Sequence, residues 1–194
     1  MERFRQIPNA ITIHRFFLAF VIPLVYFWIS PVGAFLLGLW AFASDWLDGF
    51  LARRYKQYGW QSKFGADFDP YADKFLHYGV LILLWQLGKG GGELWWPNFF
   101  ILGYDVVVFL FRHVFGFKVP SSFLGKKKTA VLFVALGFLL LPPVDPWIDA
   151  TVLQETWNMG IALLWVAAVL TLLTLLGYTG EVLRQVRARL SQVA

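Results

Sequence analysis

Cysteine is absent from the 194-residue sequence, and charged residues make up only 15% of it. Because there is no cysteine, cysteine usage says nothing about the redox compartment. The three histidines form no pair at zinc-ligand spacing, so no zinc site is expected. Linkers, low-complexity tracts and internal repeats are also lacking, which favours a single domain over residues 1–194.

Hydrophobic residues are abundant, at 58% of the chain, and the mean hydropathy is +0.59. This balance is typical of a membrane protein rather than a soluble domain. About twenty apolar residues span a bilayer as a helix. Six runs approach that length, over residues 8–28, 32–50, 69–87, 97–117, 129–141 and 157–178. We therefore expect an all-α integral membrane protein with six transmembrane helices, preceded by a short interfacial helix over residues 1–7.

Lysine and arginine are distributed unevenly around these runs. Fourteen of the 17 lie on one side of the expected membrane, and Lys89 is alone on the other. Because positively charged loops stay in the cytoplasm, both termini are expected there. The net charge of +5 then reflects topology and affinity for anionic lipid headgroups, and no nucleic-acid partner is expected. The basic segment 181–190 is expected to be a second interfacial helix.

Two aspartates lie near the end of the second hydrophobic run. Asp45 and Asp48 are three residues apart, and on a helix this spacing puts both on one face. Gly49 and Ala52 fall with them in a sector of about 100°. Small residues therefore flank the carboxylates and let a bulky group approach the backbone.

The start of the third run repeats this pattern. Gly65, Asp69 and Asp73 lie on one helical stripe, whereas Asp67 projects to the opposite side. Pro70 lacks an amide hydrogen and belongs in a first turn, so this helix is expected to start close to Asp69. The two pairs of aspartates then converge at one membrane depth.

Four carboxylates in such a place must be protonated, paired or bound to metal, because a bare charge inside a membrane is costly and like charges repel. Carboxylate oxygens in this number suit Mg²⁺ or Mn²⁺, and two ions are expected. Such a metal pair beside Arg53 is suited to binding a pyrophosphate.

These residues resemble the signature of the CDP-alcohol phosphatidyltransferase family, DxxDGxxAR followed by GxxxDxxxD. The matching positions are Asp45, Asp48, Gly49, Ala52, Arg53, Gly65, Asp69 and Asp73. The spacing between Arg53 and Gly65 is longer than is usual in the family, and this affects the placement of loop contacts such as Ser62.

Three further segments resemble family motifs. The first run begins with PNxxTxxR at Pro8, Asn9, Thr12 and Arg15, where the resemblance implies contacts to the donor nucleotide. An ordinary helix cap and a snorkelling arginine are the alternative. The fifth run is preceded by GKxKTA, with Lys126 and Lys128. A membrane anchor is the alternative to phosphate binding there.

The fourth run carries Asp105 and Arg112, seven residues apart and so facing the same way across two helical turns. Charges at this depth require partners. A salt bridge between the two is one possibility, and a positive wall for a phosphate-bearing substrate is the other. The pair resembles the family's R(E/D)x6R pattern, with Tyr104 in place of the first arginine.

The resemblance implies a transferase that moves the phosphatidyl group of CDP-diacylglycerol to an alcohol and releases CMP. It implies Asp45, Asp48 and Asp69 as metal ligands and Asp73 as the general base, which also touches a metal. Donor contacts are expected from Asn9, Thr12, Gly49, Ala52, Arg53, Ser62 and Gly65, and contacts to the acceptor phosphate from Arg112, Lys126 and Lys128. A homodimer in the bacterial inner membrane, with its active site facing the cytoplasm, is typical of such enzymes.

The acceptor and the class of protein leave alternatives open. The motifs are most similar to those of bacterial phosphatidylglycerophosphate synthases, which favours glycerol 3-phosphate as acceptor. Inositol phosphate, or phosphatidylglycerol as in cardiolipin synthesis, stays open because of Tyr104. A magnesium-dependent membrane prenyltransferase and a divalent cation transporter are the alternatives from other classes.

Overall fold

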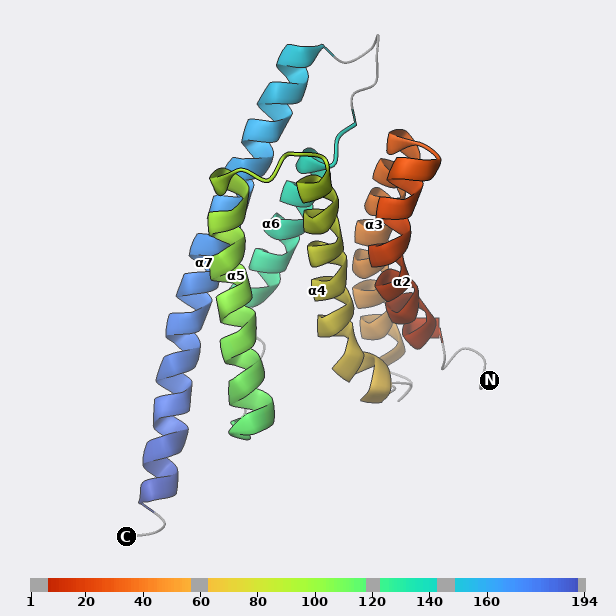
Figure 1. Ribbon diagram of the computed structural model, residues 1–194. Helices are drawn as coiled ribbons and strands as arrows, with labels where there is room; N and C mark the ends of the chain where they lie inside the picture. The colour runs from red at the N-terminus through yellow and green to blue at the C-terminus, as the bar shows by residue number, and fades with distance from the viewer. Residues whose placement is uncertain (1–6, 57–62, 118–122, 143–148, 192–194) are drawn as a thin grey trace. The chain divides into compact units, whose positions relative to one another are not determined.

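A computed structural model describes residues 7–56, 63–117, 123–142 and 149–191. The regular elements in these ranges are all helical (Figure 1). They are α2 (Ile7–Trp28), α3 (Pro31–Lys56), α4 (Lys63–Gln86), α5 (Gly92–Phe109), the π-helix η1 (Leu110–Val114), α6 (Phe123–Leu139) and α7 (Ala150–Leu190). The predicted all-α class is therefore confirmed for the described part of the chain. The six predicted hydrophobic runs lie largely on helices, and the fourth is divided between α5 and η1.

The prediction that the third run becomes helical close to Asp69 is wrong. α4 begins at Lys63, and Pro70 lies within the helix. Because Pro70 has no amide hydrogen, the carbonyl of Ala66 cannot accept a helical hydrogen bond from it. The loss of this one bond does not stop the helix, since the residues before Asp69 add more than one turn to it. Gly65 therefore lies on the same helix as Asp69 and Asp73, as their expected common stripe requires.

The predicted basic helix over residues 181–190 is present, but it is the last part of a longer helix. α7 runs without a break over 41 residues and includes this segment. No proline occurs between Ala150 and Leu190, so every residue there has a backbone amide for helix formation. The expected interfacial helix at the amino terminus lies almost entirely in residues 1–6, outside the described residues.

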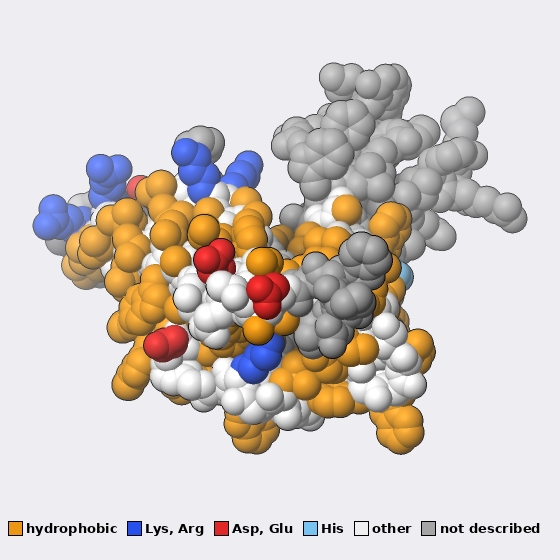
Figure 2. All heavy atoms as spheres, turned by 90° about the horizontal axis from the view of Figure 1, so that it is seen from above, with side chains coloured by type: hydrophobic (Ala, Val, Ile, Leu, Met, Phe, Trp, Pro, Cys, Tyr) orange, Lys and Arg blue, Asp and Glu red, His pale blue; other side chains and the backbone are white. Residues whose placement is uncertain are grey.

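Several helices carry the apolar surface of a membrane protein. Among the described residues, Gly92–Arg112 and Ala150–Ala188 are long and apolar enough to cross a bilayer, and Ile13–Trp28 and Pro31–Ser44 are shorter apolar segments. Large apolar side chains are well exposed, as at Trp28, which is 83% exposed. Figure 2 shows hydrophobic side chains over much of the visible surface. Exposed apolar surface of this extent is unfavourable in water, and together with the apolar helices it indicates a membrane protein.

The chain divides into two compact units, Met1–Lys89 with Leu136–Thr156 and Gly90–Ala135 with Trp157–Ala194. In the first unit α2 packs against both α3 and α4. α2 and α4 begin, and α3 ends, at the same end of this unit (Figure 1). The motif positions near the beginning of α2, the end of α3 and the beginning of α4 are therefore brought to one end of a three-helix assembly.

The contact between α2 and α4 depends on a glycine. A Cβ atom placed on Gly79 of α4 would lie 2.5 Å from the carbonyl oxygen of Ala19 in α2. Such a distance is too short for any side chain, and a backbone atom cannot turn aside as a side chain can. The two helices therefore approach backbone to backbone, a mode of packing that is typical of small residues in membrane helices.

Substitution of Gly79 by valine is expected to separate α2 from α4. Overpacking of this kind typically costs about 1–3 kcal/mol. Because Ala19 lies one turn after Arg15, the displacement should also disturb the end of the unit where the motifs meet. We expect a lower thermal midpoint for the purified protein in detergent. Gly103→Val is the matched control, because a Cβ at Gly103 meets nothing within 4 Å; equal midpoints for the two variants would contradict the close approach.

Candidate active site

Three helices supply the candidate site in the first unit. Asp45 and Asp48 lie in the last turns of α3, whereas Asp69 and Asp73 lie in the first turns of α4. The backbone is helical at all four positions, so the predicted facing of each pair agrees with the secondary structure. Because α3 ends where α4 begins, both pairs belong to the same end of the unit (Figure 1).

Several expected site residues are placed by their backbone alone. Asn9 and Thr12 lie in the first two turns of α2, Gly49, Ala52 and Arg53 lie on α3 with Asp45 and Asp48, and Gly65 and Asp69 lie on α4. Their side-chain environments, and the whole of Ser62, lie outside the described residues. Their expected contacts therefore stay predictions.

Asp73 is paired with an arginine from a different helix. Arg15 Nη1 in α2 donates a hydrogen bond to Asp73 Oδ1 in α4, with 2.5 Å between the two atoms. The Arg15 side chain is fully buried, and that of Asp73 is 21% exposed. Arg15 therefore neither snorkels to the membrane surface nor stands alone, and it joins the first motif of the sequence to the last aspartate of the cluster.

The ion pair explains how a carboxylate can stay charged in this place. A buried charge is tolerated when an opposite charge and hydrogen bonds compensate the loss of water. Arg15 supplies both through a planar guanidinium group that is always protonated. Removing one partner of such a pair typically costs about 3–5 kcal/mol because the other charge is left buried and uncompensated.

The residues at this end suit a divalent cation. Carboxylate oxygens are the ligands that Mg²⁺ and Mn²⁺ prefer, and two aspartates from α3 and two from α4 belong to one end of the unit. The pairing of Asp73 with Arg15 is compatible with a metal contact, because an ionised carboxylate has about four lone-pair sites. The donor set is therefore chemically appropriate for the metal that the sequence predicts.

A second polar cluster lies in the other unit and contains Lys128. Its Nζ atom lies 3.8 Å from Asp105 Oδ1 and 4.0 Å from the centre of the Tyr104 ring. All three residues are buried. The Tyr104 ring in turn stacks on Tyr178 of α7, with 6.1 Å between ring centroids and 21° between ring planes. The lysine is thus held between a carboxylate and an aromatic face.

The other two residues expected to bind the acceptor phosphate are exposed. Lys126 lies in the first turns of α6, and Arg112 lies in η1. Because η1 is a π-helix, its wider turns alter the register that places Arg112 two α-turns from Asp105. Asp105 forms an ion pair with Lys128 of α6. Spacing within one helix could not reveal this pair, because its partners lie on different helices.

Sequence reasoning missed the direct partners of Asp73 and Lys128. A signal existed for Arg15, since an arginine inside an apolar helix requires a compensating acid, but several aspartates were available to it. For Tyr104 the sequence shows a departure from the family pattern, but this does not identify Lys128 as its neighbour. Aromatic residues make up 19% of the chain, so composition does not single out one ring as the neighbour of a cation.

Comparison with known proteins places these residues in a family context. The family model described as CDP-alcohol phosphatidyltransferase matches residues 5–173, which run through both units. Proteins named CDP-diacylglycerol–glycerol-3-phosphate 3-phosphatidyltransferase, from Shigella flexneri serotype 5b, Shigella boydii serotype 4 and Escherichia coli strain K12, are similar over nearly the whole chain. Each is 34% identical over 187 residues, which cover 89% of this chain and 92% of the relative.

Proposed function

Since the chain belongs to the CDP-alcohol phosphatidyltransferase family, we propose that it transfers the phosphatidyl group of CDP-diacylglycerol to glycerol 3-phosphate and releases CMP. The names of its relatives support these substrates. The observation that carries the proposal is the buried Arg15–Asp73 pair at the end where α2, α3 and α4 bring their motif positions together. Family membership decides against the alternatives of a membrane prenyltransferase and a cation transporter.

The four aspartates Asp45, Asp48, Asp69 and Asp73 would hold Mg²⁺ or Mn²⁺, and we propose two ions. The chemistry that these ions supply when bound is neutralisation of negative charge on the donor's pyrophosphate. The carboxylates fix the position of that charge relative to the chain. Positioning and charge neutralisation are the main sources of rate enhancement in phosphoryl transfer, and this cluster is suited to both.

Asp73 would act as the general base. Its carboxylate takes the proton from the acceptor hydroxyl as the hydroxyl oxygen forms a bond to the lipid-side phosphorus. The bond from this phosphorus to the bridging oxygen breaks, and its electron pair leaves with CMP. Arg15 supports this role because its guanidinium donates a hydrogen bond to one oxygen of the carboxylate and fixes that oxygen in place.

The remaining motif residues divide between the two substrates. Positions on three neighbouring helix ends support contacts to the donor's nucleotide and phosphates, and basic residues on η1 and α6 support contacts to the acceptor's phosphate. The donor contacts are assigned to Asn9, Thr12, Gly49, Ala52, Arg53, Ser62 and Gly65. The acceptor contacts are assigned to Arg112, Lys126 and Lys128.

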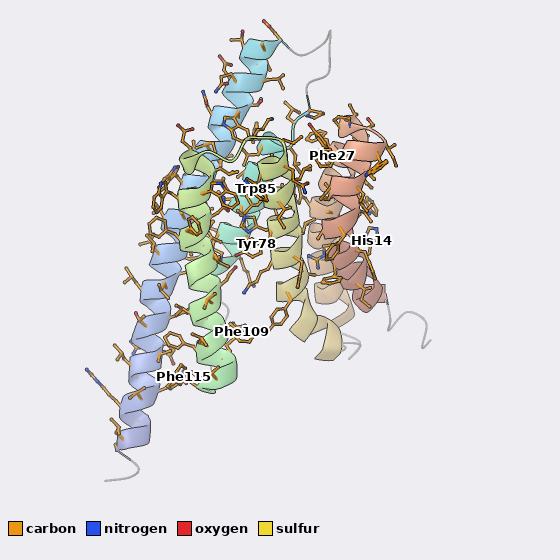
Figure 3. All side chains as sticks on the ribbon, in the orientation of Figure 1. His14, Phe27, Tyr78, Trp85, Phe109 and Phe115 are labelled. Atoms are coloured by element: carbon orange, nitrogen blue, oxygen red, sulfur yellow. The ribbon has the colours of Figure 1, made fainter. Side chains whose placement is uncertain are left out.

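An apolar groove in the first unit fits a lipid substrate. Its volume is about 970 Å³, and its walls include Ala19 and Phe27 of α2 and Phe75 and Tyr78 of α4; Phe27 and Tyr78 are labelled in Figure 3. It begins within one turn of Asp73 and continues along α4 for about 16 Å, at 1.5 Å per residue. We assign it to one acyl chain of the donor. A donor with chains too short to fill the groove should have a higher KM, and an unchanged KM would contradict this assignment.

We further propose that the chain crosses the bacterial inner membrane six times, with both termini and the aspartates at the cytoplasmic face. The positive residues near the aspartate end support this orientation. The single family match across both units supports one functional domain over residues 1–194. A homodimer is part of the same proposal. Cysteine labelling of a residue engineered in the 87–91 loop tests the topology, because cytoplasmic accessibility there would contradict it.

The acceptor is tested with purified protein, CDP-diacylglycerol, Mg²⁺ and a panel of acceptors. We expect glycerol 3-phosphate to give the fastest CMP release, because its phosphate suits basic residues at Arg112, Lys126 and Lys128. Inositol phosphate and phosphatidylglycerol complete the panel, since Tyr104 departs from the family pattern. If either of these compounds gives faster CMP release, it replaces glycerol 3-phosphate as the proposed acceptor. If no acceptor gives CMP release, the proposed reaction is contradicted.

A further inference from the structure

We propose that Tyr104 is a positioning residue for the acceptor phosphate and acts by holding the ammonium group of Lys128. This inference rests on the proposed function, because it takes Lys128 to be one of the residues that bind the acceptor. It goes further in giving a role to the residue at which this chain departs from the arginine of the family pattern.

The geometry around Lys128 carries the inference. Its ammonium lies 4.0 Å from the centre of the Tyr104 ring, well inside the range of cation–π attraction. The distance to the Asp105 carboxylate is 3.8 Å, longer than that of a charged hydrogen bond. The ring is therefore as close a neighbour of the charge as the carboxylate is. An aromatic face attracts the ammonium without competing for its N–H groups as strongly as a second carboxylate would.

Tyr104 is itself held firmly in place. Its side chain is buried, its ring stacks on Tyr178, and Val108 and Leu175 belong to the same packed cluster. A long lysine side chain has several rotatable bonds and loses much freedom when it is fixed. A rigid aromatic surface reduces the number of positions that the ammonium can take before the substrate arrives.

The identity of the residue at position 104 also sets the local charge. An arginine there would place a second cation beside Lys128 and would compete with it for Asp105. Tyrosine adds no further positive charge beside the Lys128–Asp105 ion pair. We therefore infer that the Tyr104 ring, in place of a second cation, fixes the position of the Lys128 side chain. The affinity for the acceptor phosphate then depends on the aromatic face of Tyr104.

The test compares steady-state kinetics of Tyr104→Leu, Tyr104→Phe and Lys128→Gln in the purified enzyme. Removal of the ring should raise the KM for glycerol 3-phosphate by about tenfold, the size expected for a partly desolvated cation–π contact. The KM for CDP-diacylglycerol should change less than twofold. Tyr104→Phe keeps the aromatic face and should restore the acceptor KM. Because KM does not depend on how much enzyme is folded, loss of stability alone cannot produce this pattern.

Matched controls separate the possible failures. Phe109→Leu removes an exposed ring from the same helix and should leave both KM values unchanged. If Lys128→Gln raises the acceptor KM and Tyr104→Leu does not, the role of Tyr104 is refuted while the proposed function stands. If Lys128→Gln does not change the acceptor KM, Lys128 does not bind the acceptor, and the proposed role of Tyr104 is refuted as well. Should another acceptor be preferred in the panel, the same comparison is made with that acceptor.

Discussion

Asparagine in place of Asp45, Asp48, Asp69 or Asp73 is expected to abolish CMP release, with a loss of at least about a thousandfold in kcat/KM. Asparagine keeps the size of the side chain and removes its negative charge. A divalent cation held mainly by carboxylates loses both a ligand and the charge that balances it. CMP release from CDP-diacylglycerol is measured at saturating Mg²⁺ for each variant, with thermal midpoints to confirm folding.

Asp67→Asn is the matched control for these four substitutions. Asp67 lies on α4 between Gly65 and Asp69, and at 100° per residue its position is predicted to lie on the opposite side of the helix from the stripe of Gly65, Asp69 and Asp73. The Asp67 variant should therefore keep most of the activity. Loss of activity through Asp67 comparable to that through Asp69 would refute the facing assignment on which the metal cluster depends.

Replacement of Arg15 by methionine is expected to lower kcat by about a hundredfold and to destabilise the protein. The variant leaves Asp73 without the guanidinium that lies against it, so the carboxylate loses its compensating charge and is free to move. A displaced carboxylate is no longer within hydrogen-bond reach of the hydroxyl proton that it has to accept. Loss of one member of a buried ion pair should also cost about 3–5 kcal/mol of stability. Activity and thermal midpoint are measured together.

A double-mutant cycle distinguishes the ion pair from a general packing effect. Arg15→Met with Asp73→Asn removes both charges, so the double variant should be more stable than Arg15→Met alone. Arg184→Met is the control, because Arg184 is 84% exposed and its contact with Glu181 is a surface pair worth little. Additive losses of stability from Arg15→Met and Asp73→Asn would mean that the two side chains do not interact.

Much of the helical architecture could be predicted because it depends on local sequence. Each hydrophobic run corresponds to a helix, since twenty or so apolar residues satisfy their backbone groups within one helix. Helix ends were less predictable. The rule that proline belongs in the first turn of a helix predicts the wrong start for α4. The basic composition of residues 181–190 does not reveal that they continue α7. In both cases the helix continues through residues whose pattern predicts a helix end.

The candidate site could be predicted as far as its residues lie close together along the chain. The aspartate pairs follow from spacing and helical geometry, whereas the partners of Asp73 and Lys128 come from other helices. Arg15 precedes Asp73 by 58 positions, and no periodicity connects them. The π-helix at Leu110–Val114 was likewise not predicted from the spacing of residues. Contacts between helices required the three-dimensional structure.

Aspartates on α3 and α4 are together expected to hold divalent cations at one end of the first unit. Binding of Mn²⁺ to the purified protein, followed by electron paramagnetic resonance, tests it most directly. Wild-type protein and Asp67→Asn should bind Mn²⁺ with similar affinity, whereas Asp48→Asn and Asp69→Asn, one from each helix, should each weaken binding at least about tenfold. Undiminished Mn²⁺ binding in both of these variants would contradict the account.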